Sequence, residues 1–233
     1  FIGFALVTTV LDHGMMHFQA GSWKAPFGIT IIADTFSAIM VLITTVMAFA
    51  TSIYSLSSMK NKNRVLGDMV SKKRQFAYYP LLNIMYMGIN GAFLTGDLFN
   101  MYVWFEVMLI SSFILLSIDG TKRALEGTFK YVTINLISSA FFLIGVGFLY
   151  GLTGTLNMAD LAVKVGEVEN QALVTLVAMF FLVAFGIKAA VFPLFFWLPS
   201  SYHTPPISIA AIFAGMLTKV GVYSLIRVFT LIF

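Results

Sequence analysis

The chain has 233 residues, of which 59% are hydrophobic and 10% charged, and its mean hydropathy is +0.92. A soluble domain carries about 25% charged residues, and a water-soluble protein of this length has too little interior to hide so much apolar surface. The net charge of +4 does not indicate nucleic-acid binding, because the basic residues gather in short loops between apolar segments. The absence of cysteine excludes disulfides and thiolate metal sites.

The apolar segments predict an all-α fold, a polytopic bundle of transmembrane helices. A helix needs about 20 apolar residues to cross a bilayer. Phe1–Leu11 is shorter and is interpreted as the end of a helix whose start is missing. Residues 1–233 are therefore expected to form a single transmembrane domain with six full helices and a partial one. In chain order the predicted spans are Ile29–Leu56, Tyr78–Thr95, Leu98–Ile118, Thr128–Tyr150, Ala172–Leu198 and Ile207–Phe233.

The distribution of lysine and arginine among the loops predicts the orientation of the bundle. The loops Ser57–Ala77 and Asp119–Gly127 lie on one side and carry eight basic residues between them. The loops on the opposite side carry only Lys24 and Lys164. Because cytoplasmic loops are enriched in lysine and arginine, the two basic loops and the turn at Pro199–Pro206 are predicted to be cytoplasmic. The opposite loops are Asp12–Gly28, Gly96–Asp97 and Gly151–Gln171.

Three ionisable residues lie near the middle of predicted spans, and they are the principal candidate site residues. Glu106 is the ninth residue of a 21-residue span, while Lys188 and Lys219 are the seventeenth and thirteenth residues of two 27-residue spans. Each such charge costs about 2.5–3.5 kcal/mol at the centre of a membrane helix. A chain retains them only where they face one another or face water inside the protein, so their presence indicates an ion or proton pathway.

Pro193 follows Lys188 by five residues and predicts a break in the same helix. Proline removes a backbone donor and clashes with the carbonyl group four residues earlier, here that of Ala189. Irregular backbone at membrane depth is tolerated where it is buried in protein or lines a water-filled cavity. The break is therefore expected to lie beside the candidate lysine.

The chemistry of these residues suits proton transfer. Desolvation lowers the proton affinity of a lysine, and a nearby carboxylate restores it. Movement of Glu106 relative to Lys188 would then load or release a proton, which Lys219 could take through water. A buried Glu–Lys pair can also serve only to hold helices together. Three mid-membrane charges beside a helix break favour transport over that alternative.

Weaker candidates lie nearer the ends of the spans. Lys130 and His203 are candidates for a secondary proton path, but Lys130 can equally extend to the membrane interface, and His203 is more typical of a solvated turn residue. Asp97 is interpreted as a helix N-cap, and Asp34 as an interfacial residue. Because no phosphate-binding loop or paired metal ligands are evident, no cofactor and no metal site are expected.

Four long stretches resemble the antiporter-like subunits shared by Mrp-type sodium/proton antiporters and respiratory complex I. Ser200 stands where the broader family often has an aspartate, in a Trp-Leu-Pro-Asp-Ala-His motif, and this difference favours the Mrp branch. Within that branch the chain most resembles the D-type subunits. The stretches are Trp23–Met40, Thr95–Phe113, Tyr150–Ala162 and Lys188–Arg227.

The resemblance implies a fold of about 14 helices with inverted repeats, of which this chain would cover the end of the second helix through the eighth. It implies that Glu106 and Lys188 form a charge-modulating pair, and that Lys219 is the central proton-carrying lysine. It also implies a prokaryotic plasma membrane, further subunits of a hetero-oligomeric complex as partners, and Na⁺ and H⁺ as substrates. The chain alone would then not transport.

Three alternatives stay open at this point. A homologous proton-pumping subunit of a redox-driven complex would use the same residues, and would copurify with flavin and iron–sulfur subunits. A retinal protein would form a Schiff base at Lys188, but the second buried lysine argues against it. A non-transporting assembly scaffold would tolerate neutral substitutions at all three charges.

Overall fold

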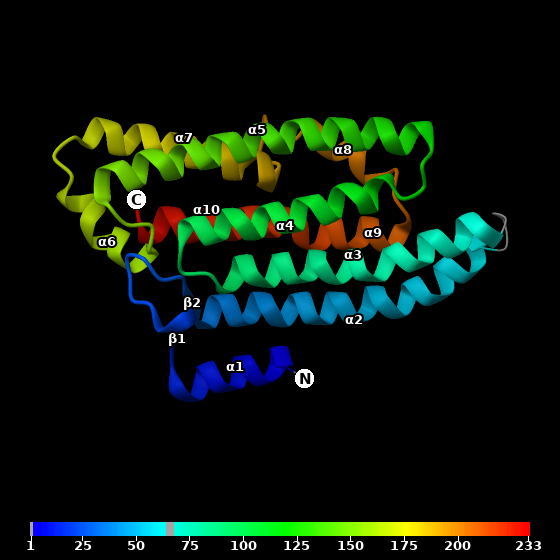
Figure 1. Cartoon of the computed structure of the whole chain (residues 1–233), viewed down its shortest axis with the longest axis horizontal. Coiled ribbons are helices and arrows are strands. Elements are labelled where there is room, and N and C mark those ends of the chain that lie inside the picture. Colours follow the sequence, from blue (N-terminus) through cyan, green and yellow to red (C-terminus); the bar gives the residue numbers. More distant parts are fainter. Residues whose placement is uncertain (1, 64–67) are drawn as a thin grey trace.

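The computed structural model describes residues 2–63 and 68–233, without the side chains of residues 58–75. Long helices lie side by side along one axis, and helices that are consecutive in the chain are neighbours in space (Figure 1). The last helices return to pack against α7, α3 and α2. The elements are α1 (Ile2–His13), β1 (Met16–Gln19), the 3-10 turn η1 (Ala20–Ser22), β2 (Thr30–Ala33), α2 (Thr35–Asn63), α3 (Asp68–Leu94), α4 (Leu98–Ser117), α5 (Lys122–Thr153), α6 (Met158–Glu167), α7 (Gln171–Ala189), α8 (Trp197–Tyr202), α9 (Ile207–Ile212), the π-helical segment η2 (Phe213–Leu217) and α10 (Thr218–Leu231).

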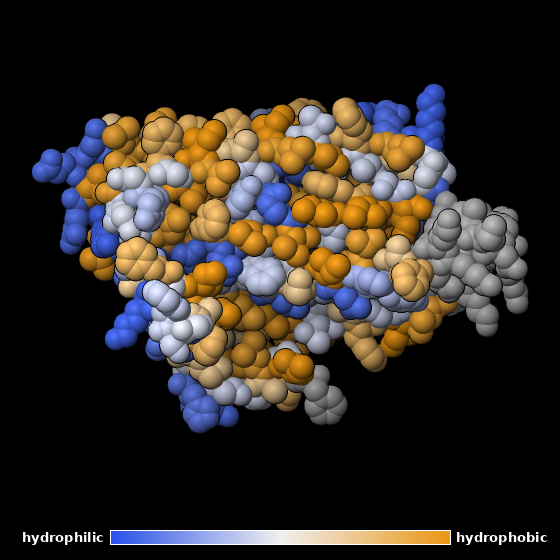
Figure 2. All heavy atoms as spheres, in the orientation of Figure 1, coloured by the Kyte–Doolittle hydropathy of each residue, from blue (hydrophilic) through white to orange (hydrophobic). Residues whose placement is uncertain are grey.

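Five helical segments among the described residues are long and apolar enough to cross a membrane, which makes the chain a multi-pass membrane protein. Helix α3 is not among these five segments, but it packs between α2 and α4 in the same direction as the bundle (Figure 1). Hydrophobic side chains cover much of the long side of the molecule, and hydrophilic ones gather toward its ends (Figure 2). The five segments are Thr35–Ser57, Leu98–Ser117, Lys122–Thr153, Gln171–Ala189 and Ile207–Leu231.

The helix ends next to the two basic loops and the turn at residues 199–206 share one end of the bundle (Figure 1). The end of α2, the start of α3, the α4–α5 turn and the α8–α9 turn all lie toward the same end of the bundle (Figure 1). Helices α2 and α3 extend well into the loop expected at residues 57–77, because the polar residues there continue the helices beyond the apolar spans. The six basic residues of that loop, Lys60, Lys62, Arg64, Lys72, Lys73 and Arg74, lie outside the described side chains.

A two-stranded sheet corrects the all-α prediction. Strands β1 and β2 pair antiparallel, with Met16 opposite Ala33 and Gln19 opposite Thr30. The segment Thr30–Ala33 therefore belongs to the hairpin, and the span expected from Ile29 begins as a helix only at Thr35. Threonine and isoleucine favour strands, but a strand of four residues is too short to produce a clear period in the sequence.

Two further loops are shorter than predicted because side chains cap the helices. The Thr121 hydroxyl accepts from the Ala124 amide, so α5 begins inside the expected 119–127 turn. The Asn157 side chain accepts from the amides of Ala159 and Asp160 and starts α6 inside the expected 151–171 loop. Threonine and asparagine are favoured N-caps because they satisfy amides that have no partner in the first turn.

Helix α7 ends at Ala189, four residues before Pro193 and one residue after Lys188. Ala190 adopts a left-handed conformation with φ of 54°, and its amide bonds to the carbonyl of Ile187. The chain re-enters a helix only at Trp197, so the segment predicted as one span over residues 172–198 is α7, a non-helical connection and the start of α8. The turn expected at residues 199–206 includes the remainder of α8.

Asp34 and Arg227 form a clamp between the start of α2 and the end of α10. Two guanidinium nitrogens of Arg227 donate to the two carboxylate oxygens of Asp34, at 2.6 and 2.8 Å. The same guanidinium lies over the rings of Phe36 and Tyr223. The Tyr223 hydroxyl donates to the Phe93 carbonyl at 2.8 Å, which ties the clamp to α3.

The clamp determines the charge of Asp34. Burial raises the pKa of this carboxyl group, but the hydrogen bonds and charge of Arg227, with the Ser37 amide, outweigh burial and lower the pKa from 3.8 to about 2. Since the folded-state pKa lies below the ordinary value, the carboxylate stabilises the fold fully above pH 3.8. That stabilisation is lost as the pH falls through 3.8 toward 2.

Replacing Asp34 by alanine should destabilise the protein, because the substitution leaves the partly buried Arg227 without its anion. Hydrogen bonds to charged groups contribute roughly 1.5–3 kcal/mol each, so we expect a clear fall in the melting temperature of the purified protein in detergent. Asp12→Ala, which removes an exposed aspartate, is the control. Equal melting temperatures for the two variants would contradict a stabilising role of the clamp.

Candidate functional site

Lys188 lies in the last turn of α7, and its side chain is buried with 4% of its surface exposed. The ammonium group lies over the ring of Phe105 from α4, 5.0 Å from the ring centroid. Its hydrogen-bond partner among the described residues is the Ser139 hydroxyl from α5, at 3.3 Å. Side chains from α4 and α5 therefore meet the Lys188 amine, which α7 itself carries near its end.

Glu106 reaches the same group through Ser139. The Ser139 hydroxyl donates to Oε1 of Glu106 at 2.5 Å, and it accepts from Nζ of Lys188. Glu106 and Lys188 form no direct ion pair, and the ion pairs within the described part of the chain join other residues. The structure therefore brings two of the three principal candidates together, with a hydroxyl group between them.

An aromatic cluster surrounds the contact. Phe105 stacks on Phe185 at 6.2 Å between ring centroids, and Phe142 packs on both rings at 5.9 and 4.8 Å. Phe181 completes the cluster against Phe142 and Phe185. These rings come from α4, α5 and α7, so the cluster joins the three helices that carry Glu106, Ser139 and Lys188, and through Phe105 it contacts the ammonium.

Lys219 lies apart from this contact. It is the second residue of α10, which directly follows the π-helical segment. Its side chain is exposed, and its ammonium donates to the Ala214 carbonyl at 2.7 Å. Gly221, two residues further along, faces the backbone of Lys188 and Ala189 on α7. Two residues turn a helix by about 200°, so Lys219 points away from α7 while the backbone of its own helix packs against it. Within the described residues, Lys219 therefore does not face Glu106 or Lys188, and its role stays a prediction.

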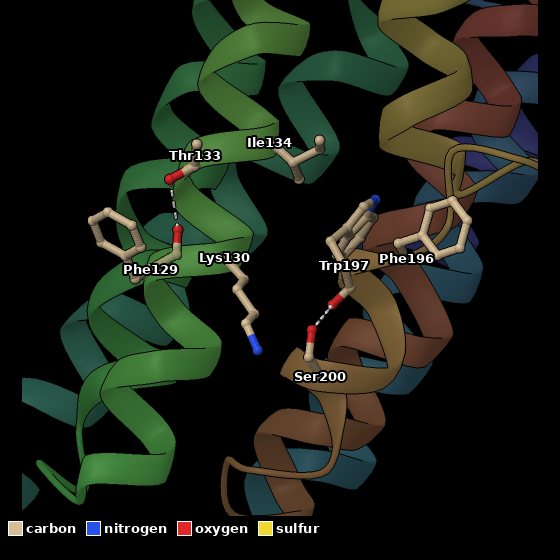
Figure 3. A pocket seen from close by; sticks show the side chains of 7 residues that line it. All are labelled: Phe129, Lys130, Thr133, Ile134, Phe196, Trp197 and Ser200. Atoms are coloured by element: carbon tan, nitrogen blue, oxygen red, sulfur yellow. Dashed lines mark hydrogen bonds between the residues drawn. The ribbon is translucent and has the colours of Figure 1, made fainter.

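Lys130 lies at an open pocket of about 350 Å³ between α5 and α8. Its side chain reaches from α5 into the space in front of Trp197 and Ser200 (Figure 3). Nζ pairs with Oε1 of Glu126 at 2.7 Å, and both side chains are more than half exposed. The Trp197 indole donates to the Ile187 carbonyl at 3.0 Å, so this ring separates the pocket from the end of α7 that carries Lys188.

His203 is exposed at the end of α8. Its Nδ1 lies 2.7 Å from the Pro199 carbonyl, a contact within the turn. No contact in the described part of the chain joins His203 to Lys188 or Glu106. The structure thus places both secondary candidates at the end of the bundle that holds the α4–α5 turn, and it links neither to the central contact.

Asp97 is an N-cap, as the sequence predicts. Its carboxylate accepts from the Asn100 amide at 2.8 Å and starts α4. Burial raises the pKa of this carboxyl group, although the amides of Asn100 and Phe99 oppose the shift. The residue lies at the opposite end of the bundle from Lys130, where Asp97 and Asn157 form a backbone bridge.

Ser139 is a member of the candidate site that the sequence analysis did not single out. The sequence around Ser139 gives little indication of its partners. A serine within an apolar helix usually bonds to the backbone of its own helix, so it needs no partner on another helix. The neighbouring Ser138 donates instead to the Ala184 carbonyl of α7, at 2.7 Å. The pair Ser138–Ser139 therefore joins α5 to both adjacent helices, a property that only the packing of the helices reveals.

The arrangement can exchange a proton between a buried amine and a carboxylate through one hydroxyl. A buried charge is costly unless it is paired and hydrogen-bonded, and this contact provides partial compensation for both charged groups. Among the described residues, no group of three histidine, cysteine, aspartate or glutamate side chains could hold a metal ion.

Comparison with known proteins identifies the class of protein that carries this site. Residues 95–233, more than half of the chain, match the family described as NADH:quinone oxidoreductase/Mrp antiporter, TM. The matched region holds α4, α5, α7 and α10, and with them Glu106, Ser139, Lys188 and Lys219. The chain belongs to this transmembrane family.

Within the family the chain is similar to the D-type subunits of antiporters. It is 48% identical over 228 residues to the D-type subunit of the Na(+)/H(+) antiporter of Bacillus subtilis (strain 168), a match that covers 98% of this chain and 44% of that protein. It matches the structure of the Mrp complex from Dietzia sp. DQ12-45-1b with a TM-score of 0.86 and 31% identity, covering 100% of this chain and 41% of that one. A membrane-bound sulfane sulfur reductase, an archaeal respiratory membrane complex, also gives a TM-score of 0.86 at 31% identity, covering 99% of this chain and 45% of that one. The chain therefore spans less than half the length of these relatives.

Replacing Gly221 by alanine should separate α10 from the end of α7. An added Cβ would lie 2.5 Å from the Ala189 amide nitrogen and 2.8 Å from the Lys188 carbonyl carbon, and these backbone atoms cannot move away cheaply. Overpacking of this kind costs about 1–3 kcal/mol, so we expect a lower melting temperature of the purified protein in detergent.

Gly147→Ala on α5 is the matched control, since nothing lies within 4 Å of its added Cβ. Alanine is also the better helix former, so this variant should melt at the same temperature as the wild type or slightly above it. If Gly221→Ala and Gly147→Ala have the same melting temperature, the close approach of α7 and α10 does not exist in the protein.

Proposed function

We propose that this chain forms part of an ion-translocating subunit of a multi-subunit monovalent cation/proton antiporter, with Na⁺ as the cation. The observation that carries the proposal is the contact from Glu106 through Ser139 to Lys188, inside a membrane-spanning bundle. Ionisable residues at this depth mark proton or ion pathways. The similarity to the D-type subunit of a Na(+)/H(+) antiporter and to an Mrp complex supports the choice of antiport.

The proposed mechanism uses Lys188 as a proton carrier whose occupancy depends on Glu106. Desolvation by the surrounding aromatic rings disfavours the ammonium form of a lysine, while a nearby carboxylate favours it. A change in the distance between the two groups would therefore bind or release a proton. The non-helical connection after Ala189 supports this role, because it lets the end of α7 move without bending a continuous helix.

We further propose that Lys219 is the next carrier, reached from Lys188 through water. The π-helical segment just before Lys219 supports this role, because π-bulges are frequent at functional sites. Lys130 and His203 would form the secondary path at the end of the bundle that carries the basic loops. The pocket at Lys130 gives protons access to the protein from that end, and Trp197 would separate it from Lys188.

The proposed setting is the plasma membrane of a prokaryote, in a hetero-oligomeric complex with other subunits of the antiporter. The loops at residues 57–77, 119–127 and 199–206 would face the cytoplasm. Their flanking helix ends lie toward one end of the bundle, which supports a common side (Figure 1).

A redox-driven proton pump is the second candidate. The match to an archaeal respiratory membrane complex, with a TM-score equal to that of the Mrp match, favours it to the same extent on fold alone. Sodium-dependent collapse of a pH gradient in everted vesicles, with the full-length protein and its partners, separates the two functions. If sodium has no effect but electron transfer drives proton uptake, and flavin and iron–sulfur subunits copurify, the antiporter proposal is wrong.

Glu106→Ala and Lys188→Ala should each abolish sodium-dependent proton exchange in the full-length protein with its partner subunits. Groups that bind and release the transferred proton contribute about 100-fold or more to its rate, so the residual exchange should be below detection. Lys219→Ala should have a similar effect if it is the next carrier. The measurement is the collapse of a pH gradient in everted vesicles, together with quantification of the assembled complex.

Glu169→Ala and Lys122→Ala are the controls, because both side chains are exposed and lie outside the central contact. They should leave exchange unchanged. Exchange at the wild-type rate in Glu106→Ala or Lys188→Ala, at equal amounts of complex, would disprove the roles of these residues.

A further inference from the structure

Ser139 occupies the only position in the described part of the chain where one side chain contacts both Glu106 and Lys188. Its hydroxyl donates to the carboxylate at 2.5 Å and accepts from the ammonium at 3.3 Å. Ser139 exposes 5% of its surface and Lys188 exposes 4%, so these two members of the contact are buried, while Glu106 is partly exposed. The two hydrogen bonds point in the same direction, from nitrogen to hydroxyl to carboxylate.

We propose that the Ser139 hydroxyl relays a proton between Lys188 and Glu106, and that it is a third member of the proton-carrying group. The inference rests on the proposed function and names the path by which its two charged residues are coupled. A hydroxyl group suits this task because it donates one hydrogen bond and accepts others at the same time.

The relay step balances without any other reactant. An N–H bond of the Lys188 ammonium breaks, and its proton binds to Oγ of Ser139. The original O–H bond of Ser139 breaks, and that proton binds to Oε1 of Glu106. The result is a neutral amine, an intact serine hydroxyl and a neutral carboxylic acid, and the reverse step restores both charges.

The surroundings of the lysine support a single relay. On its other side the ammonium meets the face of the Phe105 ring, which attracts the cation but accepts no proton. The carboxylate and the ammonium do not pair directly in the structure, so the hydroxyl is the shortest described connection between them. A purely structural serine would need only one partner, as Ser138 has in the Ala184 carbonyl.

The test compares Ser139→Ala with Ser138→Ala in the full-length protein with its partner subunits. Both variants remove one buried hydroxyl from adjacent positions of α5, but only Ser139 contacts the charged groups. Because the hydroxyl is the group that passes the proton, Ser139→Ala should slow sodium-dependent proton exchange about tenfold or more. The pH at half-maximal exchange should also move by about one unit, because the coupling of the two groups is lost.

Ser138→Ala should at most lower the amount of assembled complex. The exchange rate per complex and its pH profile should equal those of the wild type. Ser139→Thr keeps the hydroxyl and should restore both exchange and the pH profile. If Ser139→Ala does not assemble, Ser139→Cys provides the measurement, because its thiol has nearly the same volume but is a weak donor and acceptor. We expect slow exchange and a displaced pH profile from the cysteine variant as well.

The outcomes separate this inference from the proposed function. Exchange and a pH profile equal to those of the wild type in Ser139→Ala or Ser139→Cys, while Glu106→Ala and Lys188→Ala are inactive, would overturn the relay and leave the proposed function intact. Wild-type exchange in the Glu106 and Lys188 variants would overturn the proposed function itself.

Discussion

The cost of holding an ammonium group inside the membrane is the constraint on which this structure depends. Lys188 can stay at that depth only if a counter-charge and hydrogen-bond partners lie within reach. The protein meets the requirement with Glu106 on α4 and Ser139 on α5, so that three helices must pack together at one point. The stability of the bundle and the chemistry of the site therefore depend on the same contact.

Two packing features hold the helices around Lys188 together: the aromatic cluster between α4, α5 and α7, and the close contact of Gly221 with the end of α7. Phe105, Phe142 and Phe185 pack between α4, α5 and α7, and Phe105 places its ring against the ammonium of Lys188. Gly221 allows α10 to approach the end of α7 closely enough to support the residues around Ala189. A low-dielectric environment strengthens each electrostatic interaction within it, so the interaction among Glu106, Ser139 and Lys188 depends strongly on the distances between them.

Polar contacts join the helices at the end of the bundle where α2 and α4 begin. At one end Asp34 and Arg227 join α2 to α10, and the bridge between Asp97 and Asn157 joins the start of α4 to α6. The interior of the bundle instead contains a break after α7 and a π-helical segment before α10. Irregular backbone at membrane depth is tolerated where it is buried in protein or lines a water-filled cavity, and π-helical segments are frequent at functional sites.

The sequence by itself determined the class of protein and most of the apolar spans, and it singled out Glu106, Lys188 and Lys219 as ionisable residues within them, because hydropathy and charge depend on composition and spacing alone. It also indicated the N-cap at Asp97, a local interaction between residues close in the chain. Only the tertiary structure decided that Ser139 lies between Glu106 and Lys188, that Asp34 pairs with Arg227 across 193 positions, and that Lys219 points away from α7. These outcomes depend on how helices rotate and pack against one another, and a serine, an aspartate or a lysine carries no local signal of the neighbour it will meet.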